Sequence, residues 1–406
     1  MKILMINHFP LEGSGSGTYT KNLAVSLRKK GHDVTIVMPE NRADYPALEG
    51  VKLHPVFFTD DGIASGGEAA PAPEGALPFN FPCFTSHPRS VSTFDGLTDE
   101  EMEQYKNAFT KAIAEEVETN RPDVIHGQHV WILPSLAVDM GVPLVLTAHG
   151  TDLMGVDKWP HLAPYAEKAI AAASYVISIS KDNCALLEKN FPSCKDKIVM
   201  MRNGFNESVF YPVEPDRKET LAEYGLGYNG EKIVMFAGKL ANFKGIDILL
   251  EAAAIYEKKE PKTITVIAGD GDERDKLHGL AKYLELKTVH FIGNVNQEAL
   301  RKLYSIGDVS LVPSRREPFG LVAIEAMACG TPVIATNQGG LPDFVNDSVG
   351  RLVEPEDADD LAEAVTEVLT RDVDQAAWRK EIAAYAKNNY SQDAIISELE
   401  ELYERA

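Results

Sequence analysis

Two carboxylates stand eight residues apart in the segment Glu317-Pro-Phe-Gly-Leu-Val-Ala-Ile-Glu325. The apolar run before this segment predicts a short strand, Arg315–Gly320 a loop, and Leu321–Cys329 a helix. A helix that begins beyond a strand points N–H groups and the positive end of its dipole at a bound anion, which suits a diphosphate. Carboxylates in turn accept hydrogen bonds from sugar hydroxyls. The segment therefore fits a ligand that carries both groups, although acidic residues at helix starts also occur without any ligand.

Two lysines in a glycine-bounded turn supply the matching positive charge. The turn Gly238-Lys-Leu-Ala-Asn-Phe-Lys-Gly245 follows a predicted strand, Lys232–Ala237. Facing a diphosphate, Lys239 and Lys244 would neutralise the charge that grows on a departing phosphate. The alternative is two surface lysines in a polar loop, and the glutamate pair further along the chain favours the first interpretation.

A glycine-rich turn, Gly13-Ser-Gly-Ser-Gly17, follows the first predicted strand and precedes a helix predicted over Thr18–Lys30. Gly13, Gly15 and Thr18 give the pattern G-x-G-x-x-T, which makes a Rossmann oxidoreductase a rival interpretation. That rival expects an acidic residue at the end of the second predicted strand, Val34–Val37. Glu40, three residues beyond it in Met38-Pro-Glu40, meets this expectation only weakly.

A histidine lies at the end of another predicted strand. His149 belongs to Thr147-Ala-His-Gly-Thr-Asp152, which closes the apolar run Leu144–Thr147. The carboxyl ends of parallel strands are where α/β proteins bind their ligands. A lone histidine there can equally be a core residue, so its role depends on the other motifs. We expect Asp152 to orient this loop.

These segments together resemble the E-x7-E motif and its companions in the retaining glycosyltransferases of the GT-B fold, family 4. The resemblance covers nearly the whole chain, and the motifs occur in the family's order: Gly13–Gly17, Thr147–Asp152, Arg202-Asn-Gly-Phe205, Gly238–Gly245, Ala268-Gly-Asp-Gly271, Glu317–Glu325 and Gly339-Gly-Leu-Pro-Asp343. One position departs from the pattern. Lys239 stands where the family usually has arginine, and lysine lacks the planar fork that grips phosphate at two points.

The resemblance implies an α/β protein of GT-B architecture, in which two Rossmann-like doubly wound domains face each other across a deep cleft. It implies a retaining glycosyltransferase that moves a hexosyl group from a nucleotide-diphosphate sugar, with a UDP-sugar favoured and a GDP-sugar as the alternative. The hydroxyl acceptor is unidentified: a soluble sugar, a small metabolite or a lipid-linked acceptor. We expect no cofactor and no obligatory metal, because Asp270-Gly-Asp272 stands where this fold has a turn, although it has the form of a D-x-D metal motif.

Residue by residue, the resemblance assigns catalytic roles to His149, Lys244 and Glu317. It assigns nucleotide and donor binding to Gly15, Ser16, Gly17, Gly238, Lys239, Lys244, Glu317, Phe319, Gly320, Leu321 and Glu325. In this scheme Glu325 binds the ribose and the two lysines bind the diphosphate. The backbone of residues 319–321 binds phosphate and sugar, Glu317 binds ring hydroxyls, and His149 hydrogen-bonds near the reacting centre.

Strand and helix signals alternate through both halves, which is typical of doubly wound domains, and 406 residues exceed one ordinary core. We expect an acceptor-side domain over residues 1–205 and a nucleotide-sugar domain over 206–385. By analogy with the resembling family, the last helix, about 386–406, packs back on the first domain. Thr59–Thr98 is rich in Gly, Pro, Ser and aromatic residues without periodicity, and is either a lid over the acceptor or an insertion without function.

Composition narrows the partners and the compartment. The net charge of −21, from 61 acidic and 40 basic residues, disfavours nucleic acid as a partner. Four cysteines without metal-ligand spacing predict reduced thiols in a cytoplasmic protein. No transmembrane segment is predicted, and peripheral attachment at the inner membrane face is the alternative location. Two rival functions stay open: a nucleotide-sugar epimerase or phosphorylase of the same architecture, and a non-catalytic nucleotide-sugar-binding protein.

Overall fold

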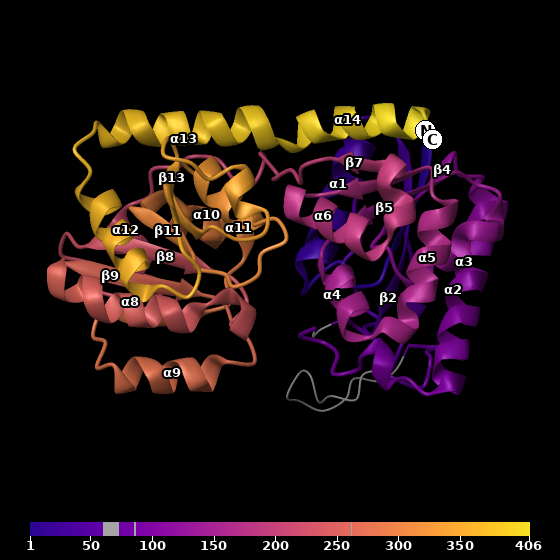
Figure 1. Ribbon diagram of the computed structural model, residues 1–406, viewed down its shortest axis with the longest axis horizontal. Helices are drawn as coiled ribbons and strands as arrows, with labels where there is room; N and C mark the ends of the chain where they lie inside the picture. The colour runs from indigo at the N-terminus through magenta and orange to yellow at the C-terminus, as the bar shows by residue number, and fades with distance from the viewer. Residues whose placement is uncertain (60–72, 85–86, 261) are drawn as a thin grey trace. The chain divides into compact units, whose positions relative to one another are not determined.

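The computed structural model describes residues 1–59, 73–84, 87–260 and 262–406. The chain divides into two compact units, which are Met1–Arg202 with Ile395–Ala406, and Asn203–Ala394. Each unit is built on a parallel sheet with helices on its faces (Figure 1). We call them the N-terminal and the C-terminal unit.

Among the described residues, the N-terminal unit carries a seven-stranded parallel sheet in the order β3-β2-β1-β4-β5-β6-β7. The strands are β1 (Lys2–Asn7), β2 (Asp33–Glu40), β3 (Lys52–Phe57), β4 (Val124–Gln128), β5 (Leu144–Ala148), β6 (Tyr175–Ser178) and β7 (Ile198–Met200). Along β1, Ile3 and Met5 join one buried cluster, while Leu4 and Ile6 join another on the opposite face. Both faces are covered, as a parallel sheet requires. The strand order reverses between β1 and β4, and the carboxyl ends of such a pair form the usual ligand crevice.

Helices on the two faces complete the N-terminal unit. They are α1 (Gly15–Lys29), η1 (Phe94–Gly96), α2 (Asp99–Asn120), α3 (Ile132–Ala137), η2 (Val138–Met140), α4 (Thr151–Lys158), η3 (Pro160–Leu162), α5 (Ala163–Ala172), α6 (Lys181–Asn190), η4 (Pro192–Lys197) and α14 (Gln392–Glu404). The last of these, α14, buries Ile395, Ile396, Leu399 and Leu402 in the same cluster as Ile3, so the end of the chain completes this core.

The C-terminal unit repeats the plan with a six-stranded parallel sheet in the order β10-β9-β8-β11-β12-β13, counted over the described part of the chain. Its strands are β8 (Lys232–Ala237), β9 (Thr263–Ala268), β10 (Val289–Gly293), β11 (Val309–Val312), β12 (Val333–Thr336) and β13 (Gly350–Val353). Its helices are α7 (Arg217–Ala222), η5 (Asn242–Lys244), α8 (Ile246–Lys259), α9 (Arg274–Tyr283), α10 (Gln297–Ile306), α11 (Leu321–Ala328), η6 (Leu341–Asp343), α12 (Ala358–Thr370) and α13 (Gln375–Tyr390). Here the strand order reverses between β8 and β11, which carry the lysine turn and the glutamate segment.

The start of α1 corrects one prediction. The helix begins at Gly15, three residues before the predicted Thr18, so Gly15, Ser16 and Gly17 form its first turn. The reason is Ser14, which serves as the N-cap and accepts a hydrogen bond from the Gly17 N–H over 3.0 Å. Gly15 and Gly17 are therefore helical residues, and the N–H group of Gly17 is occupied by the Ser14 cap.

The segment Thr59–Thr98 is only partly described, because residues 60–72 and 85–86 lie outside the described residues. Four of its phenylalanines, Phe79, Phe81, Phe84 and Phe94, are buried in the N-terminal core. The described part of the segment is thus integral to the fold. Its proposed role as a lid over an acceptor stays a prediction.

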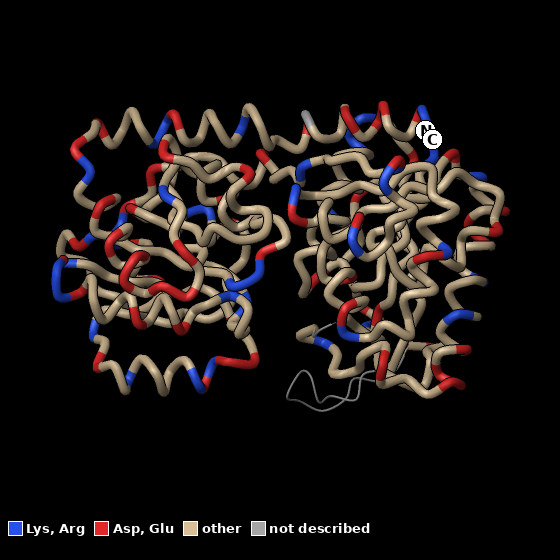
Figure 2. Tube along the Cα trace, viewed as in Figure 1, with Lys and Arg blue, Asp and Glu red and all other residues tan. Residues whose placement is uncertain are grey.

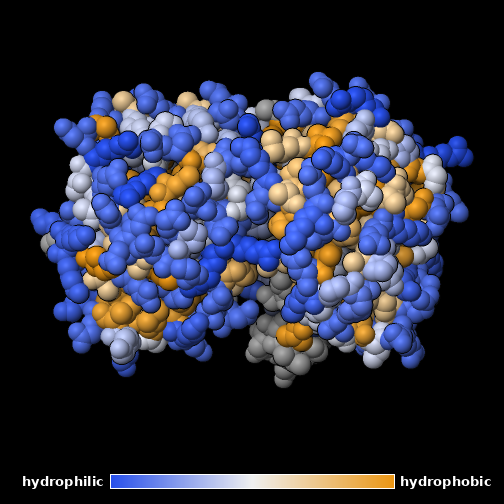
Figure 3. Space-filling view, viewed as in Figure 1, coloured by the Kyte–Doolittle hydropathy of each residue, from blue (hydrophilic) through white to orange (hydrophobic). Residues whose placement is uncertain are grey.

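Figures 2 and 3 show how charge and hydropathy are distributed in one view of the molecule. Figure 2 shows acidic and basic residues interspersed along both units, with no single basic stripe in this view. The face in Figure 3 is mainly hydrophilic with scattered apolar side chains. Within the described ranges, no helix is both long enough and apolar enough to cross a membrane.

Candidate functional site

In the C-terminal unit, the structure brings Lys244 and Glu317 together. The Lys244 ammonium donates to Glu317 Oε2 over 2.5 Å, and the Ser314 hydroxyl donates to the same oxygen over 3.0 Å. Both charged side chains are largely buried, with 18% and 8% of their surface exposed. A buried pair is tolerated only when its charges compensate each other. A lysine retains two further N–H donors in such a pair, which leaves Lys244 able to bind an anion as well.

The turn after β8 and the loop after β11, which carry Lys244 and Glu317, are packed closely against each other. Gly245 has φ +67°, and a Cβ atom there would lie 2.0 Å from the carbonyl oxygen of Pro313, so only glycine fits. Arg315 donates its backbone N–H to the Phe243 carbonyl and pairs with both oxygens of Asp247 over 2.8 Å. The turn after β8 is therefore fixed against the loop after β11.

The other lysine, Lys239, lies where the turn after β8 packs against the turn after β9. Its ammonium is 3.6 Å from Asp272 Oδ2. The turn after β9 packs against the turn after β8 so closely that a Cβ atom on Gly269 would lie 1.9 Å from the Gly238 carbonyl oxygen. Asp270 caps its own turn and pairs with Arg274 over 3.2 Å. Both carboxylates of Asp270-Gly-Asp272 thus contact basic protein groups.

The N-terminus of α11 presents unobstructed N–H groups. Gly320 is its N-cap with φ +102°, and it has no side chain that could cap the first turn. No acidic residue occupies that turn. A Cβ atom on Gly320 would lie 2.6 Å from Leu341, and the ring of Phe319 packs on Phe344 with 5.5 Å between centroids. Residues 319–321 are therefore held in place with their N–H groups available to a phosphate.

Glu325 lies in α11, one turn beyond Leu321. Its side chain is partly exposed, and burial of the carboxyl group raises its pKa to about 8. No hydrogen bond or ion pair compensates it among the described residues, and burial together with the Glu325 charge raises the pKa of both Tyr304 and Cys329. A carboxyl group kept in such surroundings without a cation is typical of a functional site.

In the N-terminal unit, His149 is held on three sides. Its Nε2 is 3.0 Å from Gln128 Oε1, and its ring lies 5.1 Å from the ring of Tyr19 and 4.9 Å from that of His129. Burial lowers the pKa of His149 to about 3, so the imidazole is neutral at physiological pH. The imidazole is therefore a weak base whose Nε2 contacts the Gln128 side chain.

The first turns of α1 lie beside His149, because the ring of Tyr19 in this helix contacts the imidazole. A Cβ atom on Gly17 would lie 2.2 Å from the Pro10 carbonyl oxygen, which restricts this position to glycine. Gly15 is exposed, and a Cβ atom there would meet nothing within 4 Å. Gly15 and Ser16 therefore offer open backbone to an approaching ligand.

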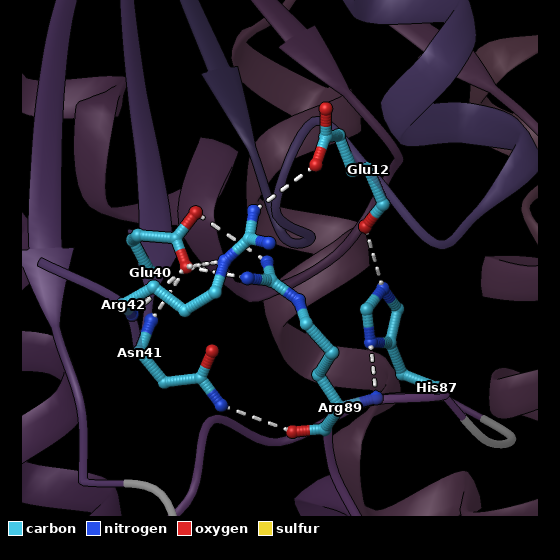
Figure 4. Close-up of polar contacts among 6 residues, drawn as sticks. All are labelled: Glu12, Glu40, Asn41, Arg42, His87 and Arg89. Carbon is cyan, nitrogen blue, oxygen red and sulfur yellow. Dashed lines mark hydrogen bonds and ion pairs between the residues drawn. The ribbon is translucent and has the colours of Figure 1, made fainter. Parts of the chain in front are cut away.

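A polar network ties the glycine-rich turn to the segment around residue 89 (Figure 4). Arg89 donates to buried Glu40 over 2.6 Å, and Arg42 donates to Glu12 over 3.0 Å. His87 contacts the Glu12 carbonyl oxygen, and Asn41 donates to the Arg89 carbonyl oxygen over 3.1 Å. Figure 4 shows both guanidinium groups directed toward Glu40, whose burial requires such partners.

Sequence reasoning missed this network and the surroundings of His149. Arg42 and Arg89 carry no motif, and only the folded chain brings them together. His129 follows β4 as His149 follows β5, and this shared position at a strand end was a signal that could have identified it.

Two family models match the two halves of the chain. Residues 13–209 match the model of Glycosyltransferase Family 4, and residues 218–389 match that of Glycosyl transferases group 1. The chain is 30% identical to an uncharacterized glycosyltransferase of Methanocaldococcus jannaschii, over 100% of this chain and 98% of the relative. It is also 30% identical to a D-inositol 3-phosphate glycosyltransferase of Corynebacterium aurimucosum, over 99% and 96%.

Among solved structures, the Anabaena protein HepE in complex with UDP and glucose superposes with a TM-score of 0.77 and 21% identity, over 100% of both chains. That similarity shows the fold. The matches to glycosyltransferase models decide against the oxidoreductase alternative. The chain therefore belongs to the family 4 glycosyltransferases, enzymes of the GT-B fold.

Proposed function

We propose that this enzyme moves a hexosyl group from a nucleotide-diphosphate sugar, a UDP-sugar in the first place, to a hydroxyl acceptor with retention of the anomeric configuration. The observation that carries the proposal is the Lys244–Glu317 pair, set beside the open N-terminus of α11 and followed by Glu325 within that helix. A cation, helix N–H groups and two carboxyl groups together match a diphosphate that bears hydroxyls on both sides.

Each group takes the role that its geometry allows. Lys244 and Lys239 neutralise the diphosphate, and the N–H groups of residues 320–321 bind its oxygens. Glu317 accepts hydrogen bonds from the sugar ring, while Glu325 binds the ribose hydroxyls. When Glu325 is protonated, as its raised pKa of about 8 favours at neutral pH, it both donates and accepts a hydrogen bond.

On the acceptor side, the exposed first turn of α1 and the neutral imidazole of His149 hydrogen-bond to hydroxyl groups. His149 is too weakly basic to take up a proton, since its pKa is lowered to about 3. The acceptor's proton therefore goes to the leaving phosphate, whose negative charge grows as the sugar bond breaks. This front-face course retains the configuration at the sugar carbon. A UDP-containing structural neighbour supports the choice of base.

The test follows the reaction itself. The enzyme is incubated with UDP-glucose, UDP-galactose, UDP-N-acetylglucosamine and GDP-mannose in the presence of a panel of sugars and polyols, and nucleotide release is measured. Proton NMR of the first product then reads the configuration of the new bond. Transfer from an α-linked donor should give an α-linked product. A β-linked product, or free epimerised sugar, would refute the proposal.

A further inference from the structure

One buried carboxylate joins the turns that follow β4 and β5. Asp152 Oδ1 accepts the N–H groups of Gly150 and Leu153 over 2.8 and 3.0 Å, and Oδ2 accepts the Val130 N–H over 2.9 Å. The first two bonds are local to the start of α4. The third reaches a residue 22 positions away in the chain, so it is more than ordinary capping of a helix. Asp152 is fully buried, and backbone N–H groups are its hydrogen-bond donors.

The turn that Asp152 reaches is strained. His129, directly before Val130, has φ +126°, a backbone conformation that residues other than glycine rarely adopt. Its ring is fully buried between Phe9 and Phe84, and neither ring nitrogen finds a hydrogen-bond partner among the described residues. Strain of this kind persists only where surrounding interactions enforce it, and it gathers at functional sites. The bond from Val130 to Asp152 is the adjacent interaction that can enforce it.

The same turn sets the position of His149. Gln128, on one side of the strained residue, contacts His149 Nε2 over 3.0 Å, and the His129 ring packs 4.9 Å from the His149 ring. The third contact of His149, Tyr19, comes from α1 and is independent of this turn. Two of the three groups that orient His149 therefore depend on the conformation that Asp152 holds.

We propose that Asp152 is a positioning residue: its bond to Val130 holds the turn after β4 in the strained conformation that orients His149. The inference rests on the proposed function, because that function gives His149 its role. The hydrogen bond from Val130 to Asp152, which we call the clamp, orients His149 through the backbone of a neighbouring turn.

The test is Asp152→Asn, which keeps the shape and removes one acceptor. An asparagine oxygen that keeps the Gly150 and Leu153 bonds leaves its NH2 group facing the Val130 N–H, donor against donor. The substitution therefore removes the hydrogen bond that holds the strained turn. We expect kcat to fall about 100-fold, since misplacing a reacting group by about 1 Å costs that much. The affinity for UDP should not change, because its proposed ligands are in the C-terminal unit. The matched control is Asp157→Asn on the same helix. The exposed Asp157 carboxylate accepts a hydrogen bond from the Asn190 side chain over 3.3 Å, and this variant should leave kcat unchanged.

A second variant separates positioning from simple loss of stability. Glycine adopts φ +126° without strain, so Asp152→Asn should cost a smaller factor in kcat in a His129→Gly background than in the wild type. Equal factors in both backgrounds would overturn the proposal.

If the proposed function is wrong, no donor will be turned over and kcat cannot be measured. Two physical measurements then still test the clamp. Hydrogen exchange at Val130 should accelerate in Asp152→Asn, and the imidazole 15N resonances of His149 should shift. If neither the exchange rate at Val130 nor the His149 resonances change in Asp152→Asn, the clamp is contradicted, whatever the transferase activity of the variant.

Discussion

The Lys244–Glu317 pair makes a prediction whose size follows from its burial. Lys244→Ala removes the cation and leaves the Glu317 carboxylate, 8% exposed, with Ser314 as its remaining side-chain partner. Removing one member of a buried ion pair costs about 3–5 kcal/mol. At about 2–4 °C per kcal/mol for a domain of this size, the melting transition of the C-terminal unit should fall by about 6–20 °C. Glu317→Gln should cost less, because a buried amide is cheaper than a buried charge and the freed lysine can extend toward water.

The two variants should also differ in how they respond to nucleotide. UDP at about 100 times its dissociation constant stabilises the wild type by ~2.7 kcal/mol, which differential scanning calorimetry resolves. Lys244→Ala should lose most of this response because Lys244 binds the diphosphate. Glu317→Gln should keep it, because Glu317 binds the sugar, which UDP lacks, and should lose transfer instead. The reasoning fails if Lys244→Ala retains the full UDP response, or if Glu317→Gln is the more destabilised variant.

Three further predictions concern the same unit. Gly320→Ala should destabilise it by about 1–3 kcal/mol in urea unfolding and weaken UDP binding, because φ +102° and the 2.6 Å approach of Leu341 exclude a Cβ atom; equal stability of this variant and the wild type would argue against the described turn. Burial raises the pKa of Glu325 from 4.5 to about 8, so the folded state binds more protons than the unfolded state across that window. Stability should therefore fall as pH rises from about 5 to 8, by at most about 1.4 kcal/mol per pH unit, and Glu325→Gln should flatten this slope; a slope that persists in Glu325→Gln would place its origin elsewhere. Finally, UDP binding and transfer should be unchanged by EDTA, and a loss restored by magnesium would show that the reaction needs a metal.

The two sheets were largely predictable from the sequence because their central strands are continuous apolar runs, which parallel sheets buried on both faces require. Lys232–Ala237 was predicted with the bounds of β8. Three strands were missed, namely β3, β7 and β13, and all three are edge strands. In β3 the burial pattern is mostly intermediate, and Pro55 interrupts it, so the apolar signal is weak.

The site was predictable where motif residues are neighbours along the chain. The loop and helix around Glu317 and Glu325 were predicted from turn and capping signals, and the structure confirms the start of α11 at Leu321. The Lys244–Glu317 contact spans 73 residues, and local patterns do not encode such a distance. The strain at His129 was beyond prediction for a related reason. It depends on the bond between Asp152 and Val130, which forms only when β4 and β5 pair.

The central claim is that the C-terminal unit binds a nucleoside diphosphate through Lys244 and Glu325. Isothermal titration calorimetry with UDP, GDP, ADP and TDP in the absence of magnesium, on the wild type and on Glu325→Ala, tests it most directly. The account predicts that one nucleotide, UDP in the first place, binds the wild type, and that Glu325→Ala binds it at least about tenfold more weakly, the ~1.4 kcal/mol of a lost hydrogen bond. Binding of none of the four, or equal binding by both proteins, would contradict it.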